Sequence, residues 1–95
     1  MNQNDPPTEH ILACLSSSPS NAKIVRTAAT MAKAFGGTFT ALYVRTPDSD
    51  QMGKEDCRRL QQHIRMAEQA GANISTIYGD DIPQQIAEFA RISGI

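Results

Sequence analysis

The side chains most able to do chemistry in this sequence lie in one short run of hydroxyls. Ser16, Ser17 and Ser18 are followed by Pro19 and Ser20, directly before a segment with helical spacing. A helix N-terminus carries unpaired N–H groups and a partial positive charge that favour an anion, and serine hydroxyls add short donors. The run is therefore a candidate phosphate site. Spacing alone favours an ordinary polar turn that caps a helix.

Other candidate groups for catalysis or metal binding are weak. We interpret His63, in QQHIRM, as a helix-surface residue, because no acidic residue follows it as in the phospho-acceptor box of histidine kinases. His10 begins a strand without a partner at ligand spacing, Cys14 is expected to be a small buried apolar residue, and Cys57 an unreactive helix residue. No CxxC, HExxH or GxSxG pattern occurs. The sequence predicts no metal site and no enzyme.

Composition narrows the class of protein. The chain has 95 residues, of which 40% are hydrophobic and 20% charged, as in an ordinary soluble domain. Nine basic and ten acidic residues give a formal charge of −1, which argues against a polymeric nucleic acid as partner. Two cysteines make no disulfide framework, so we expect a reducing, cytoplasmic compartment. Residues 1–8 read as a flexible leader, and residues 9–95 as one domain.

Strands and helices alternate along the chain. Apolar or β-branched runs predict strands at 10–15, 38–44 and 73–78. Helical spacing follows the turn at 16–21 and stops at Gly36, a second helix spans about 53–70, and a third follows Asp81 as N-cap. The expected apolar stripe of the first helix is Ile24, Val25, Ala28, Ala29, Ala32 and Phe35, and that of the last helix is Ile86, Phe89 and Ala90.

This order predicts an α/β fold, a doubly wound parallel sheet with right-handed crossovers. The first strand of such a sheet is normally central, yet strands two and three occupy only one side of it. Residues 10–15 would then form an unpaired apolar edge. We therefore expect a domain whose C-terminal strands are missing, cut from a longer protein, or one completed by a homodimer through this first-strand edge.

The segment CLSSSPSNAKIVRTAATMAKAFGGTFTALYV resembles the universal-stress-protein-like domain of the KdpD family of osmosensitive, potassium-responsive sensor histidine kinases. In that family Ser-x-Ser, twenty residues and Phe-Thr-Ala-x-Tyr form a pattern associated with cyclic di-AMP. Here Ser16 and Ser18 are followed by residues 19–38 and then by Phe39, Thr40, Ala41 and Tyr43, so the spacing of the pattern is matched with no insertion or deletion. The resemblance covers roughly residues 9–95 and implies a Rossmann-like fold related to the adenine nucleotide alpha hydrolases.

The resemblance also implies a ligand. Ser16 and Ser18 would hold a phosphodiester, Thr40 and the backbone at Ala41 an adenine edge, and Tyr43 would stack on a base. Alternation along a strand places Phe39 with Ala41 and Tyr43 on one face and Thr40 on the other, so the side chains cannot all reach one ligand. Phe39 and Ala41 also fit a simple buried strand.

Three functions follow as hypotheses. The first is a cytoplasmic sensor domain of a membrane-bound kinase that takes part in two-component signal transduction, binds a signalling nucleotide and acts on the parent kinase domains. The second is a scaffold that docks universal stress proteins. The third is a stand-alone ATP-binding stress protein, but the glycine-rich segment that binds ATP in such proteins does not occur here, and neither does a GxxxxGK[ST] loop. ATP is therefore unsupported as a cofactor.

Overall fold

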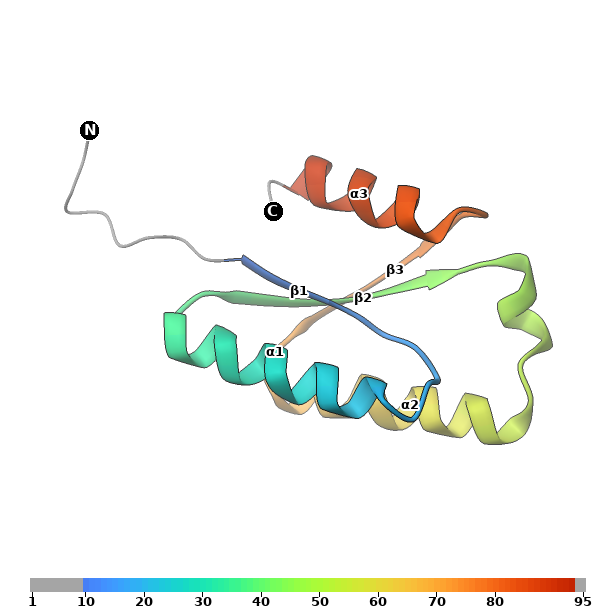
Figure 1. Ribbon diagram of the computed structural model, residues 1–95, viewed down its shortest axis with the longest axis horizontal. Helices are drawn as coiled ribbons and strands as arrows, with labels where there is room; N and C mark the ends of the chain where they lie inside the picture. The colour runs from blue at the N-terminus through green and yellow to red at the C-terminus, as the bar shows by residue number, and fades with distance from the viewer. Residues whose placement is uncertain (1–9, 94–95) are drawn as a thin grey trace.

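A computed structural model describes residues 10–93, so the predicted leader at residues 1–8 lies outside the described residues. The elements follow the predicted β-α-β-α-β-α order, and the predicted strand and helix limits differ from the observed ones by at most about one residue (Figure 1). They are β1 (His10–Cys14), α1 (Asn21–Phe35), β2 (Thr38–Arg45), a 3-10 helix (Pro47–Gln51), α2 (Lys54–Gln69), β3 (Asn73–Tyr78) and α3 (Ile82–Ser93).

The three strands form one parallel sheet in the order β1-β2-β3. In the register, Cys14 at the end of β1 lies opposite Leu42, and Arg45 at the end of β2 lies opposite Tyr78. Helices α1 and α2 cover one face of the sheet, and α3 lies on the opposite face (Figure 1). The predicted α/β class and parallel sheet are confirmed.

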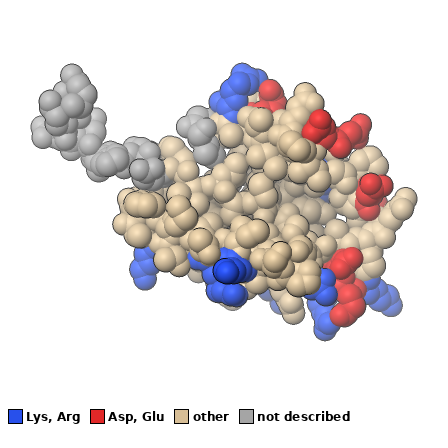
Figure 2. Space-filling model, viewed as in Figure 1, with Lys and Arg blue, Asp and Glu red and all other residues tan. Residues whose placement is uncertain are grey.

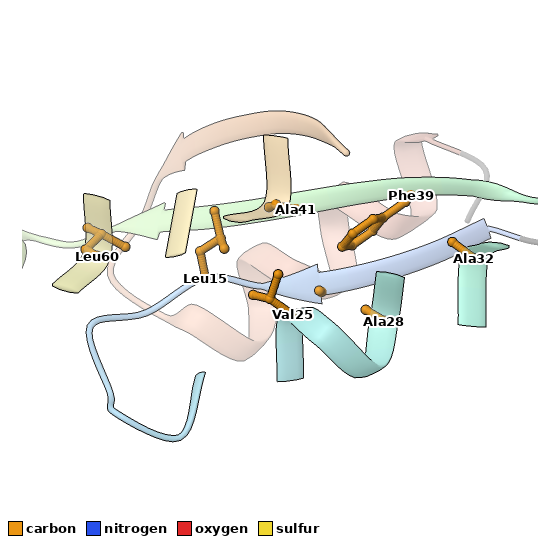
Figure 3. Close-up of a cluster of buried hydrophobic side chains, with 9 residues drawn as sticks. Leu15, Val25, Ala28, Ala32, Phe39, Ala41 and Leu60 are labelled. Carbon is orange, nitrogen blue, oxygen red and sulfur yellow. The ribbon is translucent and has the colours of Figure 1, made fainter. Parts of the chain in front are cut away.

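The main core lies between the sheet and the pair α1–α2 (Figure 3). On β2, Phe39 and Ala41 belong to this core and Tyr43 packs against it, which confirms the predicted alternation of faces. Val25, Ala41 and Ala67 are fully buried. Small side chains at these contacts let helix and sheet backbones approach closely. Phe39 is the one buried aromatic residue among the described residues.

Two members of the predicted α1 stripe were placed wrongly. Val25, Ala28 and Ala32 are buried, but Ile24 is 50% exposed and Phe35 is 55% exposed. The apolar stripe of α1 is wider than the surface of this helix that the three strands cover. Ile24 and Phe35, at the margin of the stripe, therefore stay exposed. On α3 the prediction holds in part, because its expected face is half-buried, with no residue of the helix fully buried.

Short-range sequence signals explain why α1 ends at Phe35 and why α3 begins at Ile82. Gly36 adopts φ = 66°, in the left-handed region that suits glycine, and its N–H bonds to the last carbonyls of α1. The Asp81 carboxylate accepts a hydrogen bond from the N–H of Gln84 at 3.2 Å, as expected for an N-cap.

We predict that Leu42→Ala lowers the free energy of unfolding by about 2–5 kcal/mol, because Leu42 is fully buried in the central strand and its loss leaves a cavity. Ile92→Ala is the control, since Ile92 is 73% exposed. Its effect should stay within about 0.5 kcal/mol in the same urea titration. Equal losses in the two variants would contradict the burial of Leu42 in the central strand.

Candidate functional site

A cavity of about 350 Å³ lies at the carboxyl ends of β1 and β2. Parallel α/β sheets bind ligands at this end of their strands. Ser16 and Tyr43, both predicted site residues, line the same cavity. Its other walls are Leu15, Ser17, Val44, Thr46, Asp48, Ser49, Met52, Asp56 and Ile82.

The serine turn is held by hydrogen bonds between its own residues. The N–H of Ser18 donates to Oγ of Ser16 at 3.2 Å, and the Oγ atoms of Ser18 and Ser20 lie 2.9 Å apart. The N–H of Asn21 donates to the carbonyl of Ser18 at 2.9 Å as α1 begins. Ser18 is exposed beside the cavity wall rather than part of it. The turn is therefore ordered, with the hydroxyls of Ser18 and Ser20 facing each other and that of Ser16 accepting the N–H of Ser18.

The buried side chain of Asn21 joins this turn to the end of β1. Its Nδ2 donates to the carbonyl of Cys14 at 2.8 Å, and its Oδ1 accepts the N–H of Ser16 at 3.0 Å. Asn21 is 2% exposed. One carboxamide thus bonds to β1 as the backbone of a neighbouring strand would, and it fixes the direction in which the chain leaves the sheet.

Two residues of α2 hold the same turn from the other side. Nδ1 of His63 donates to the carbonyl of Ser16 at 2.7 Å, and Nη1 of Arg59 donates to that of Ser17 at 3.0 Å. His63 is only 3% exposed, so its interpretation as a helix-surface residue was wrong. The sequence pattern missed it because its partner is 47 residues away along the chain.

The remaining predicted site residues lie away from the cavity. Phe39 is 4% exposed and lines a different hollow, of about 720 Å³, at the other end of the strands. Ala41 is fully buried, and alternation directs Thr40 to the α3 face. At about 3.3 Å per residue, Phe39 lies about 13 Å along β2 from Tyr43. The structure therefore brings Ser16 and Tyr43 together but not Phe39, Thr40 and Ala41.

Acidic side chains gather at this end of the molecule (Figure 2). Two of them, Asp48 and Asp56, line the cavity. Asp56 is paired with Nη1 of Arg59 at 3.1 Å, so this guanidinium is already shared with a carboxylate. A bound anion would have to draw on Arg59 and on backbone N–H groups rather than on a basic pocket.

A second charged group lies at the ends of β2 and β3. The Arg45 guanidinium bonds to Asp50 at 2.6 Å and lies 4.8 Å from the centroid of the Tyr78 ring. Its hydrogen bond to Asp50 raises the pKa of Arg45 above its usual value, so this group stays charged. The arrangement ties the 3-10 helix to the ends of β2 and β3.

Two candidate reactive features of the sequence can be checked in the described residues, the Cys14 thiol and a cluster of metal ligands. Burial raises the pKa of the Cys14 thiol, which keeps this cysteine protonated at neutral pH. Among residues 10–93, no group of three His, Cys, Asp or Glu side chains gathers as metal ligands. No helix formed by the same residues is long and apolar enough to cross a bilayer.

Comparison with known proteins decides the family. The model of the universal stress protein family matches residues 7–90. The chain belongs to this family. It is 38% identical over 85 residues to Sensor protein KdpD of Clostridium acetobutylicum, covering 90% of this chain. It is 28% identical over 81 residues to Sensor protein KdpD of Escherichia coli, covering 85% of this chain. The chain spans 9% of the length of each of these relatives. The resemblance inferred from the serine turn and the FTALY strand is confirmed.

We predict that Asn21→Ala lowers the free energy of unfolding by about 1–3 kcal/mol, because it removes a buried carboxamide and leaves partly buried backbone groups of β1 and the turn without its hydrogen bonds. Ser20→Ala is a suitable control, since Ser20 is exposed and its side chain does not cap α1. Urea unfolding measures both. A Ser20→Ala loss as large as that of Asn21→Ala would refute the role of the carboxamide.

Proposed function

We propose that this chain is the cytoplasmic regulatory domain of a KdpD-type sensor histidine kinase that responds to potassium. In this proposal the domain binds a signalling nucleotide, cyclic di-AMP, at the cavity between the serine turn and β2. The domain itself catalyses no reaction, and the parent kinase domains read its bound state.

The observation that carries the proposal is the shared cavity of Ser16 and Tyr43. These residues belong to the two halves of the pattern that the resemblance associates with cyclic di-AMP, and 26 residues separate them in the sequence. The membership in the universal stress protein family and the similarity to Sensor protein KdpD support the same assignment.

The size and polarity of the cavity suggest how the ligand binds. Its volume of about 350 Å³ lies at the low end of the roughly 300–1,000 Å³ typical of ligand sites. We therefore expect one nucleotide half of the ligand to enter, with its base against Tyr43 and a phosphate beside the serine turn. Ser18 would contact the second half at the rim, while Phe39, Thr40 and Ala41 would shape β2 from a distance.

The bonds from α2 to the turn offer a route for the signal. His63 and Arg59 hold the carbonyls of Ser16 and Ser17, so a ligand that moves the turn also shifts α2. A ligand changes the output only if it binds one conformation of the domain more tightly than another. In this proposal, the two conformations differ in whether these two hydrogen bonds are made.

Calorimetry of the chain with cyclic di-AMP tests the proposal. Tyr43→Leu and Ser16→Ala are expected to weaken binding at least about tenfold, which corresponds to about 1.4 kcal/mol. Phe35→Leu and Ser93→Ala are the matched controls, because both residues are exposed and line no part of this cavity. No heat at tens of micromolar ligand, or equal losses in the controls, would defeat the proposal. A titration with ATP tests the stress-protein alternative.

One observation favours a second candidate, a scaffold that docks universal stress proteins. The outer side of β1 pairs with no other strand within residues 10–93 and lies beside exposed apolar side chains of α1. Such an edge can bind another chain by adding a strand. A pull-down of a universal stress protein that survives Ser16→Ala and Tyr43→Leu would favour this candidate over nucleotide sensing.

A further inference from the structure

Arg59 of α2 lies directly behind the wall of the cavity that Ser16 and Tyr43 share. Its Nη1 donates to the carbonyl of Ser17 at 3.0 Å and to Oδ1 of Asp56 at 3.1 Å, and both of these residues line the cavity. Among the described residues, Arg59 is the only Lys or Arg whose side chain hydrogen-bonds to this wall. It is therefore the cation best placed to meet an anion in the cavity.

Much of the hydrogen-bonding capacity of this guanidinium is unused. A guanidinium has five N–H groups in one plane, and both hydrogen bonds of Arg59 are made by Nη1. The Nε–H and the two N–H groups of Nη2 make no hydrogen bond to the residues that the structure describes. The side chain is 31% exposed, so a ligand in solution can reach them. The Nε–H and one N–H of Nη2 form a fork that fits two oxygens of a phosphate.

The Asp56 carboxylate is the anion that Arg59 holds in this structure. The pair is an i, i+3 contact on α2, with side chains that are 31% exposed for Arg59 and 51% exposed for Asp56. An ion pair this exposed contributes little to stability, because water screens both charges. Another anion can therefore replace Asp56 as the partner of Arg59 with little loss. Because Asp56 also lines the cavity, its negative charge repels any anion that enters.

We propose that Arg59 is the phosphate-binding residue of this cavity and that Asp56 is a built-in competitor for it. A phosphodiester takes the free fork of Arg59, and Asp56 gives up its bond to the guanidinium. Asp56 lowers the affinity of the cavity in two ways, since it holds the guanidinium and repels the incoming charge. The inference rests on the proposed function in its choice of ligand, because cyclic di-AMP is the phosphodiester expected beside the serine turn.

The same helix carries a matched ion pair that lies outside the cavity. Nη2 of Arg58 donates to the two carboxylate oxygens of Glu55 at 2.6 Å and 3.0 Å, also with i, i+3 spacing. Their side chains are 68% and 71% exposed, and neither residue lines the cavity. One residue corresponds to a rotation of about 100° around the helix axis, so this pair faces another direction. Substitutions of Glu55 and Arg58 therefore measure the general effect of charge on α2.

Calorimetry with cyclic di-AMP tests the role of Asp56. Asp56→Asn is expected to tighten binding at least about threefold, because it frees Arg59 and removes a like charge from the cavity. A gain of affinity cannot come from a misfolded chain, so this result is independent of any effect of the substitution on stability. Glu55→Gln removes the same charge one residue earlier and should change the affinity by less than about twofold, since solvent and salt screen it.

A double-mutant cycle tests whether Asp56 acts through Arg59. Arg59→Gln should weaken binding at least about tenfold because it removes a charge-assisted hydrogen bond, Arg59→Lys should weaken it less because the charge remains without the fork, and Arg58→Gln should have little effect. In the Arg59→Gln background, Asp56→Asn should tighten binding clearly less than in the unaltered chain. A gain of the same size or larger there would mean that Asp56 acts by charge repulsion alone, and it would overturn the competitor role.

Titration with inorganic phosphate at constant ionic strength separates this inference from the proposed function. Phosphate has no base to place against Tyr43, but it can bind the fork of Arg59. In ¹H–¹⁵N NMR, the Nε–H signal of Arg59 and the amide signal of Ser17 should shift with one saturation curve. Saturation should come at a lower phosphate concentration in Asp56→Asn. The Nε–H signal of Arg58 should not follow this curve.

The two titrations together distinguish the possible failures. Binding of cyclic di-AMP that Asp56→Asn and Arg59→Gln leave unchanged would overturn this inference and keep the proposed function. Phosphate binding at Arg59 in a chain that does not bind cyclic di-AMP would keep the assignment of Arg59 and overturn the proposed function. A chain that binds neither ligand would overturn both.

Discussion

The carboxamide of Asn21 is the interaction on which the functional end of this molecule depends. Nδ2 and Oδ1 satisfy the carbonyl of Cys14 and the N–H of Ser16, groups that a neighbouring strand would otherwise bond. The side chain is 2% exposed, so the carboxamide itself depends on these two backbone partners rather than on water. By ending β1 in this way, Asn21 sets the path of the serine turn. The turn is then placed where His63 and Arg59 of α2 can hold its carbonyls.

This arrangement separates two surfaces of the same strand. At its carboxyl end, β1 leads into the cavity shared by Ser16 and Tyr43. Along its outer side, β1 pairs with no other strand within residues 10–93 and lies beside apolar residues of α1. Asn21 lies between these two surfaces, because its Nδ2 donates to the carbonyl of Cys14, the last residue of β1. The residues that line the cavity at the strand end and those that line the groove along its side are different, so each surface can be altered by its own substitutions.

Much of the fold could be predicted because its signals are local. Strand-length apolar runs, the glycine that ends α1 and the Asp81 cap each depend on residues a few positions apart. The buried roles of Asn21 and His63 could not be predicted from such local signals, since the hydrogen-bond partner of His63 is 47 residues away in the sequence. The exposed state of Ile24 was missed for a related reason: the width of an apolar stripe does not tell how many strands cover it. For the site, alternation along β2 already separated Thr40 from Tyr43, whereas the distance of Phe39 from the turn required the sheet register.

The central claim is that the serine turn and the end of β2 act as one binding surface. Two-dimensional ¹H–¹⁵N NMR of the labelled chain during a titration with cyclic di-AMP tests it directly. The account predicts that the amide signals of Ser16, Ser17 and Tyr43 shift together with one saturation curve, while those of Gly37 and Gly71, at the opposite end of the strands, stay in place. Shifts confined to that opposite end, or serine and tyrosine signals that saturate at different ligand concentrations, would contradict it.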